Sequence, residues 1–279
     1  MVNDAPIGVF DSGVGGLTVI KELMNLLPGE NLIYFGDTAR VPYGSRPTAE
    51  ITQFTEEMLQ FLSTKEIKMA VMACNAITTV CHAQLRSNYS FPVIGMNLGV
   101  DRAVQLSTTK RVGVIATVAT IRSGLHERAI VARDAQFKVY PVGCPKFVPL
   151  IEKGVLDGEQ IDEAMDEYLL PLKEAGVDVL ILACTHYPFI MDAIGRIMGK
   201  EVTLINPAYE TAKDVVAVLK DSYQLAGRKQ GSVELCFSAG VEQAERMAGH
   251  LFNTRPVKFT KINLQDFCQC SRNFEKNLV

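Results

Sequence analysis

Val71-Met72-Ala73-Cys74-Asn75 and Ile181-Leu182-Ala183-Cys184-Thr185 are two short stretches of this chain with nearly the same pattern. Each is an apolar run that ends in alanine, cysteine and a polar residue, which predicts a buried strand with a thiol at its carboxyl end. Open α/β sheets bind their ligands outside the carboxyl ends of the strands. The two stretches therefore predict a site with a thiol on either side, which suits chemistry on both faces of one carbon atom.

The segments that precede the two cysteines also correspond. Val112–Thr117 parallels Ile7–Ser12, and each run lies a similar distance before the cysteine of its half. Strands alternate with helices in both halves, which predicts right-handed βαβ units and parallel sheets. The alternative is that two unrelated βαβ units share this spacing by chance. We expect an α/β fold of two similar domains with mostly parallel sheets, related by pseudo-twofold symmetry, and an active site in the cleft between them.

The length of 279 residues suits two domains of ordinary size. We expect a first domain of residues 1–97 plus 208–279 and a second domain of residues 98–207. The hydrophobic pattern predicts helices and strands that can be checked individually. The predicted helices span residues 17–27, 48–63 and 209–225, and the predicted strands span residues 7–10, 32–35, 93–94, 233–238 and 257–262.

Composition narrows the functional classes. The net charge is −3 and no block of lysine or arginine is present, so no nucleic-acid partner is expected. No apolar run approaches the roughly 18 residues of a membrane span, so no membrane partner is expected. The first residues lack the pattern of a signal peptide, and the seven cysteines are irregularly spaced. We therefore expect a cytoplasmic protein with reduced thiols rather than a disulfide framework.

The segment Gly13-Val14-Gly15-Gly16 follows the first predicted strand. It is not a dinucleotide fingerprint, because Thr18 stands where the third glycine is needed, and no Gly-Lys-Ser/Thr follows for a phosphate loop. A glycine-rich turn at a helix N-terminus offers free backbone N–H groups to a small anion such as a carboxylate. The alternative is a tight strand-to-helix turn with no ligand.

The chemistry of the predicted site depends on its two thiols. Cys74 and Cys184 each precede a predicted helix, whose dipole lowers the pKa of a thiol. The alternative for each cysteine is that it only packs in the hydrophobic core. The pair Cys268-Gln269-Cys270 has no second ligand pair at zinc spacing, so we interpret it as tail or surface thiols and expect no metal site. Three further cysteines have no such context: Cys81, Cys144 and Cys236.

Three side chains are candidates to assist the thiols. His186 comes two residues after Cys184 and can act as an orienting group or proton partner. Asp11 ends the first strand and can assist Cys74, although capping the next helix is its alternative role. Glu152 is predicted to lie near His186, and its alternative is a solvated carboxylate at a helix start.

Several motifs occur together, in a fixed order, over nearly the whole chain. They are Ile7-Gly8-Val9-Phe10-Asp11-Ser12-Gly13-Val14-Gly15-Gly16-Leu17, Gly36-Asp37-Thr38-Ala39-Arg40, Pro42-Tyr43-Gly44, Ala73-Cys74-Asn75, Ala116-Thr117-Val118-Ala119-Thr120 and Ala183-Cys184-Thr185-His186-Tyr187-Pro188. A chain with these motifs resembles the cofactor-independent glutamate racemases of bacterial cell-wall synthesis, within the aspartate/glutamate racemase superfamily. The resemblance implies racemisation of glutamate without a cofactor, to supply D-glutamate for peptidoglycan, with a homodimer as one assembly found in the family.

The resemblance also implies roles for individual residues. Cys74 acts on D-glutamate and Cys184 on L-glutamate, one removing the α-proton while the other donates a proton to the opposite face. Asp11 assists the first thiol, and His186 with Glu152 assists the second. The residues implied to bind substrate are Asp11, Ser12, Tyr43, Gly44, Asn75, Thr185 and His186, with Thr117 and Thr120 on a matching loop.

Two departures from the family pattern leave further functions open. Ala76 stands where the family usually has a threonine, so Thr78 or a water would have to replace the missing hydroxyl. Ile205-Asn206-Pro207 stands where aspartate is frequent in the family. The loss at Ala76 motivates an aspartate or broad-specificity racemase as the runner-up. Two functions of a different class also stay open: a cysteine hydrolase that uses Cys184 with His186, and a non-catalytic glutamate-binding or regulatory partner protein.

Overall fold

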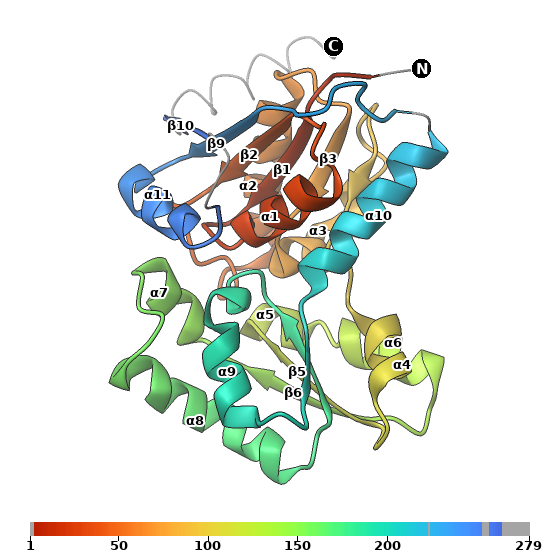
Figure 1. Cartoon of the computed structure of the whole chain (residues 1–279), viewed down its shortest axis with the longest axis vertical. Coiled ribbons are helices and arrows are strands. Elements are labelled where there is room, and N and C mark those ends of the chain that lie inside the picture. The colour runs from red at the N-terminus through yellow and green to blue at the C-terminus, as the bar shows by residue number, and fades with distance from the viewer. Residues whose placement is uncertain (1–2, 223, 253–256, 264–279) are drawn as a thin grey trace.

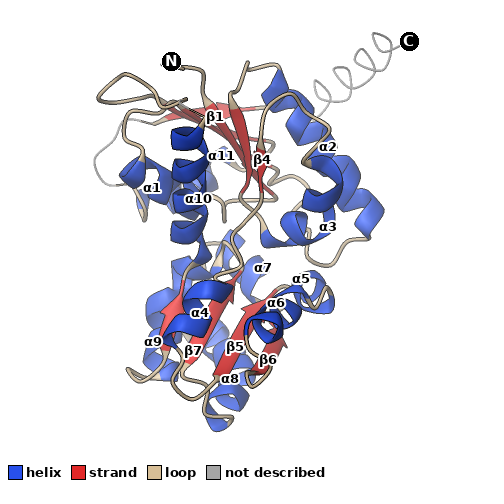
Figure 2. Ribbon diagram, turned by 90° about the vertical axis from the view of Figure 1, so that its right-hand side faces the viewer, coloured by secondary structure: helices blue, strands red, loops and turns tan. Residues whose placement is uncertain are grey.

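The strands in the described part of the chain form two separate sheets, and every strand pair in them is parallel (Figures 1 and 2). The computed structural model describes residues 3–222, 224–252 and 257–263. In spatial order the first sheet contains β10 (Lys258–Lys261), β9 (Val233–Phe237), β2 (Leu32–Gly36), β1 (Ile7–Asp11), β3 (Met69–Met72) and β4 (Val93–Ile94). The second contains β6 (Lys138–Gly143), β5 (Arg111–Ala116), β7 (Val179–Ala183) and β8 (Thr203–Ile205).

The two sheets repeat one topology. The order β2-β1-β3-β4 in the first sheet matches β6-β5-β7-β8 in the second. Cys74 follows β3 and Cys184 follows β7, so the two thiols occupy equivalent strand ends. Chance similarity of spacing does not account for a shared order of four strands. The expected α/β fold with two similar halves is therefore confirmed, and β9 and β10 extend the first sheet beside β2.

Helices cover both faces of each sheet (Figures 1 and 2). Because of this cover, β1, β3 and β7 are buried at every position and read as continuous apolar runs. The first sheet lies between two groups of helices: α1 (Leu17–Leu26), α10 (Pro207–Asp221) and α11 (Val241–Gly249) on one face, α2 (Thr48–Ser63) and α3 (Asn75–Leu85) on the other. The second sheet is flanked by α4 (Val100–Leu106), α5 (Val118–Arg122) and α6 (Leu125–Arg133), and opposite them α7 (Phe147–Glu152), α8 (Glu159–Glu174) and α9 (Met191–Met198).

The predicted elements are found in the structure, and many of their ends differ from the prediction by one to four residues. Helix 48–63 and strand 93–94 are found as predicted. The helix predicted over 209–225 begins earlier, at Pro207, because Asn206 caps it by accepting a hydrogen bond from the Ala208 N–H at 3.1 Å. It ends at Asp221. Asn206 therefore performs the capping that an aspartate would perform at this position.

The strands of each sheet fall on the expected sides of the domain boundaries. All strands of the first sheet lie within 1–97 or 208–279, and all strands of the second lie within 98–207. The exact division of the chain into domains stays a prediction. In the described part of the chain, no helix has both the length and the apolar character that crossing a bilayer requires.

Candidate active site

The two equivalent cysteines lie in one site. Cys74 ends the turn after β3 and is the N-cap residue of α3, and Cys184 directly follows β7. The charge of Cys184 is one cause of the raised pKa of Cys74, so the two sulfurs are close enough to interact. Each cysteine is 6% exposed. Both cysteines are therefore buried between the two halves.

The environment of Cys74 corrects one expectation. Burial raises the pKa of the Cys74 thiol well above its ordinary value, the Asp11 charge raises it further, and a hydrogen bond from the backbone of Ile77 only partly opposes this. The predicted lowering by a helix dipole is therefore outweighed. Ser12 connects the groups, since its Oγ lies 3.7 Å from Cys74 Sγ and donates to Asp11 Oδ1 at 3.2 Å.

Asp11 is fully buried and joins both halves of the chain. Its Oδ1 accepts from the Ser12 N–H at 2.7 Å, and its Oδ2 accepts from the Gly16 N–H and from Thr185 Oγ1, the latter at 3.3 Å. Burial raises the pKa of Asp11, while the positive charge of His186 acts in the opposite direction. The carboxylate next to Cys74 is therefore sensitive to the charge state of the group that accompanies Cys184.

The second thiol belongs to a line of three polar side chains. Cys184 Sγ lies 3.8 Å from His186 Nδ1, and His186 Nε2 lies 2.6 Å from Glu152 Oε1. Burial alone lowers the pKa of His186, but the hydrogen bonds and charges of Cys184 and Glu152 raise it well above its ordinary value. The imidazolium is thus the favoured form of His186. The structure brings together the three residues that the sequence suggested, including Glu152 from α7.

An α-helix after Cys184 was also expected, and this expectation is wrong. The segment Tyr187–Ile190 forms a short 3-10 helix, and α9 begins only at Met191. His186, rather than an α-helix N-terminus, therefore supplies positive charge next to Cys184.

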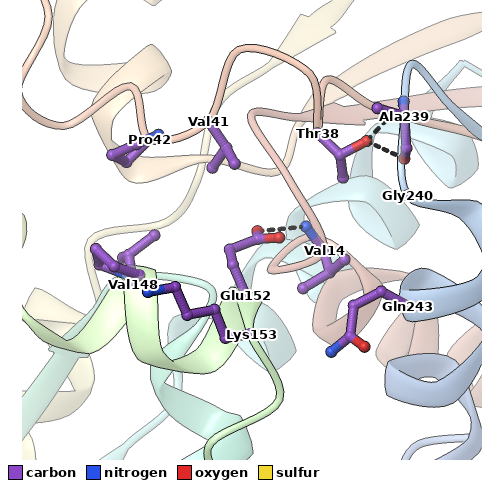
Figure 3. Close-up of a pocket in the computed structure, with 11 residues that line it drawn as sticks. Val14, Thr38, Val41, Pro42, Val148, Glu152, Lys153, Ala239, Gly240 and Gln243 are labelled. Atoms are coloured by element: carbon purple, nitrogen blue, oxygen red, sulfur yellow. Dashed lines mark hydrogen bonds between the residues drawn. The ribbon is translucent and has the colours of Figure 1, made fainter.

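The glycine-rich turn binds carboxylates of the protein itself. The Val14 N–H donates to Glu152 Oε1 at 2.9 Å (Figure 3), and the Ser12 and Gly16 N–H groups bind Asp11. A side chain at Gly13 would place a Cβ 2.0 Å from Glu152 Oε1. A carboxylate at this turn was expected, and the structure has carboxylates there. They belong to Asp11 and Glu152 of the same chain, whereas a bound ligand was expected.

Comparison with known proteins places this geometry in a family. The model of the Asp/Glu/Hydantoin racemase family matches residues 7–215, most of the chain. This chain belongs to the Asp/Glu/Hydantoin racemase family. It is therefore a racemase, an isomerase, as the resemblance of its motifs implied.

Relatives of this racemase align over nearly their whole length. The glutamate racemase of Lactococcus lactis subsp. lactis is 39% identical over 95% of this chain and 98% of its own. The crystal structure of glutamate racemase isoform RacE1 from Bacillus anthracis superimposes with a TM-score of 0.87 at 34% identity, covering 93% of this chain and 98% of that one. The glutamate racemase of Francisella tularensis, crystallised with D-glutamate, gives 0.82 at 34% identity, covering 93% and 97%.

Asn75 is, among the described residues, a buried side chain whose two polar atoms both lack a partner. Its side chain is 3% exposed, and neither its Oδ1 nor its Nδ2 has a hydrogen-bond partner in the structure. Buried polar atoms without partners are costly, and a ligand that supplies the partner removes that cost. Because Asn75 directly follows Cys74, this unpartnered amide belongs to the residue next to that thiol.

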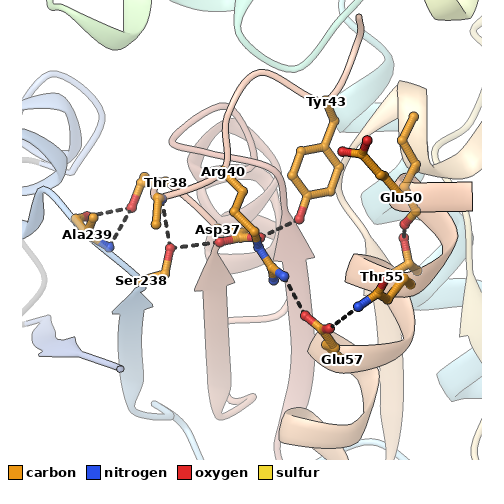
Figure 4. A network of polar contacts seen from close by, with 12 residues as sticks. Asp37, Thr38, Arg40, Tyr43, Glu50, Thr55, Glu57, Ser238 and Ala239 are labelled. Atoms are coloured by element: carbon orange, nitrogen blue, oxygen red, sulfur yellow. Dashed lines mark hydrogen bonds and ion pairs between the residues drawn. The ribbon is translucent and has the colours of Figure 1, made fainter. Parts of the chain in front are cut away.

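Tyr43 has its hydroxyl engaged elsewhere (Figure 4). The Tyr43 hydroxyl donates to Asp37 Oδ2 at 2.5 Å, and Ser238 Oγ donates to Asp37 Oδ1 at 2.8 Å. Burial and the Asp37 charge raise the pKa of Tyr43. The side chain therefore anchors its loop, while the backbone of the loop at Gly44 contacts the second half. A Cβ at Gly44 would lie 2.5 Å from Thr117 Cβ.

Thr117 and Thr120 organise the start of α5. The Thr117 Oγ1 accepts from the Thr120 N–H at 3.4 Å, and the two hydroxyl oxygens are 3.2 Å apart. The Ala119 N–H donates to the Gly44 carbonyl at 3.1 Å, which joins this helix to the first half of the chain. Both threonines thus help to position the loop that carries Gly44.

Sequence reasoning missed one contact between the halves. Thr18, the residue that breaks the dinucleotide fingerprint, has an Oγ1 that lies 3.1 Å from the Thr185 carbonyl and donates to it. The same hydroxyl lies 2.9 Å from the Gly15 carbonyl. A threonine on a buried helix face gives no sequence signal for such a contact.

Thr78 does not replace the hydroxyl that is missing at Ala76. Ala76 is buried at the start of α3, and the Thr78 hydroxyl accepts from the Met96 N–H at 3.0 Å and lies 3.4 Å from the Met72 carbonyl. The suggestion that Thr78 replaces the missing hydroxyl is therefore wrong, because that hydroxyl is already hydrogen-bonded.

The remaining cysteines carry no chemistry that the structure reveals. Cys81, Cys144 and Cys236 are buried free thiols, and no disulfide joins any cysteines in the described ranges. Cys268 and Cys270 lie outside the described residues. No group of three or more His, Cys, Asp or Glu side chains suited to a metal ion occurs in the part of the chain that the structure describes.

Two of the cavities that described residues form lie between residues of the two halves. The first, the Glu152 cavity, has a volume of about 330 Å³ and is lined by residues that include Val14, Val41, Glu152, Lys153 and Gln243 (Figure 3). The second, the Arg122 cavity, has a volume of about 770 Å³. Its lining includes Gly44, Arg46, Thr48, Thr79, Val118 and Arg122.

Proposed function

We propose that this racemase interconverts L- and D-glutamate by a two-cysteine mechanism and supplies D-glutamate for peptidoglycan synthesis. The observation that carries the proposal is the pair of thiols at equivalent strand ends, each with its own polar partners. The names of the relatives support glutamate as the substrate, since proteins called glutamate racemase align over nearly the full chain. A solved relative from Francisella tularensis was crystallised with D-glutamate.

The proposed reaction moves one proton off the α-carbon and another onto it. With D-glutamate, the Cys74 thiolate removes the α-proton, and the electron pair of the broken C–H bond stays on the α-carbon and its carboxylate. The Cys184 thiol then donates its proton to the opposite face, and that electron pair forms the new C–H bond. Afterwards Cys74 is a thiol and Cys184 a thiolate, so the reverse reaction starts from L-glutamate. The thiol pair supplies both acid and base without a cofactor.

The surroundings of the two sulfurs differ. Burial and the Asp11 charge favour the neutral thiol at Cys74. Cys184 Sγ instead lies 3.8 Å from His186 Nδ1. Cys74 is therefore proposed to start as the acid, which is the direction of reaction that begins from L-glutamate.

Several groups are proposed to hold the substrate. Asn75 offers its unpartnered amide, and Ser12 and Thr185 present buried hydroxyls beside the thiols. Gly44 offers backbone from the loop that closes on the second half. Preorganised donors in a dry site stabilise the carbanion-like transition state, and holding both thiols at the α-carbon contributes up to about 7–11 kcal/mol in well-oriented cases.

The test is the change in circular dichroism of L- and D-glutamate solutions with the wild-type enzyme and two variants. We expect racemisation by the wild type and a severe loss in both Cys74→Ser and Cys184→Ser. In D₂O, Cys74→Ser is expected to retain slow α-proton exchange with L-glutamate only, because Cys184 still reaches that face. Retained activity in Cys74→Ser together with a trapped acyl-enzyme on Cys184 would instead indicate a cysteine hydrolase.

Substrate specificity needs a separate comparison. Ala76 removes a hydroxyl that Thr78 does not replace, which is the observation that favours an aspartate or broad-specificity racemase as the second candidate. Turnover of L-aspartate at a rate equal to or above that of L-glutamate would support it. Glutamate binding without any α-proton exchange would support a non-catalytic binding or regulatory role. We also propose a cytoplasmic location and a homodimer, for which sedimentation of the purified protein is the test.

A further inference from the structure

The two cavities between the halves differ in charge. Glu152 and Lys153 line the Glu152 cavity, so a carboxylate is part of its wall (Figure 3). Arg46 and Arg122 line the Arg122 cavity, and no acidic residue is among the described residues that line it. A positive cavity stands out in a chain of net charge −3, which as a whole repels an anion.

Arg122 contributes the unneutralised charge. Arg46 donates to Glu50 Oε2 at 2.9 Å and to the Arg40 carbonyl, so much of its charge is compensated. Arg122 is exposed at the end of α5, where the helix dipole favours a cation. Its side chain makes no hydrogen bond or ion pair with any other residue that the structure describes.

The Arg122 cavity lies near the residue that follows Cys74. Thr79, in its wall, lies four residues after Asn75 on α3 and therefore on the same helix face. Gly44, also in its wall, contacts Thr117 at the start of α5. A molecule in this cavity is thus about one helical turn from the unpartnered Asn75 amide and from Cys74.

We propose that the Arg122 cavity is the entrance through which a dicarboxylate reaches the thiols, and that Arg122 attracts it. This inference rests on the proposed function, because a dicarboxylic amino acid carries a net negative charge near neutral pH. A charged cavity raises the local concentration and the association rate of an oppositely charged ligand, and salt suppresses the effect. The Glu152 cavity offers a dicarboxylate no such attraction, because Glu152 and Lys153 in its wall have opposite charges.

Charge substitutions test the attraction in the full-length enzyme. At low salt we expect kcat/KM for glutamate to fall about 3-fold in Arg122→Gln and about 10-fold in Arg122→Glu, with kcat unchanged. Near 1 M salt the differences should vanish, since the Debye length is then about 3 Å. Lys153→Gln, a charge removal at the other cavity, is the matched control and should leave kcat/KM unchanged. Equal kcat/KM for wild type and both Arg122 variants at low salt would overturn the attraction.

A pair of tryptophan substitutions tests the route itself. Thr48 is exposed in the wall of the Arg122 cavity, and Lys153 is exposed in the wall of the Glu152 cavity. Thr48→Trp is expected to lower kcat/KM at least 5-fold with an unchanged melting temperature, whereas Lys153→Trp leaves it within 2-fold. The opposite pattern would place the entrance at the Glu152 cavity and overturn the inference. Absence of any turnover by the wild type would overturn the proposed function first.

Discussion

Glu152→Gln tests the proposed support of the second thiol. The substitution keeps the size of the side chain and removes its charge, while Glu152 Oε1 binds His186 Nε2 at 2.6 Å and the Val14 N–H at 2.9 Å. Hydrogen bonds to charged groups contribute about 1.5–3 kcal/mol and neutral ones about 0.5–1.5 kcal/mol. The variant therefore loses about 1–2 kcal/mol of hydrogen-bond stabilisation at His186. At about 1.36 kcal/mol per factor of ten in rate, this corresponds to a fall in kcat/KM of about 5- to 30-fold.

The pH profile gives a second readout of the same substitution. The charge and hydrogen bond of Glu152 are among the causes that raise the pKa of His186. Without them the imidazolium loses its proton at lower pH, so the alkaline decline of kcat/KM should begin at lower pH than in the wild type. If Glu152 had only a structural role, the substitution would not shift the alkaline part of the pH profile.

The assay is circular dichroism with each glutamate enantiomer as substrate. Because enantiomers have equal free energy, the equilibrium constant is one and kcat/KM must fall equally in both directions, which checks the measurement. Glu159→Gln, the same change at an exposed position, is the control. A variant within 2-fold of wild-type kcat/KM and with an unshifted pH profile would refute the role of Glu152.

Three further predictions concern the turn, the core and acid stability. Gly15→Ala would place a Cβ 2.4 Å from His186 Nδ1, so kcat should fall about 100-fold in a folded protein, and near-normal kcat would contradict this. In the wild type, Lys68 Nζ lies 2.6 Å from Glu30 Oε2, and Lys68→Met leaves this buried carboxylate without its charged partner. Urea unfolding should show a loss of about 3–5 kcal/mol in the free energy of unfolding, and a loss below 1 kcal/mol would contradict this. Burial lowers the pKa of His126 from 6.5 to about 4. As the pH drops from about 6.5 to 4, this histidine is protonated in the unfolded chain but not in the folded one, so the free energy of unfolding falls. His126→Leu should flatten the free energy of unfolding over that window, and an unchanged slope would count against it.

The alternation of strands with helices and the equivalence of the two cysteines could be predicted from the sequence. Apolar runs such as Val71–Ala73 report burial on both faces of a sheet, and the repeated Ala-Cys ending reports equivalent strand ends. Helix ends were less well predicted where a cap such as Asn206 and a following proline start the helix early. Local residue chemistry determines these features, so local patterns reveal them.

The partners of the turn could not be predicted in the same way. The pattern around Gly13 indicated a carboxylate but gave no indication that it belongs to Glu152, 139 positions away along the chain. The loss of helix-dipole control at Cys74 also depended on how deeply the packed halves bury the thiol. Neither property is local, because both depend on which distant side chains folding brings within a few ångströms.

By itself, then, the sequence determined the doubled α/β architecture and the residue types at the two strand ends, since hydrophobic period and motif order are written along the chain. Only the tertiary structure decided that Glu152 joins His186 to the turn, that Tyr43 is held by Asp37, and that a positive cavity opens beside Arg122. Hydrogen bonding, burial and electrostatic fields act through space, so their outcome is fixed when the two halves pack together.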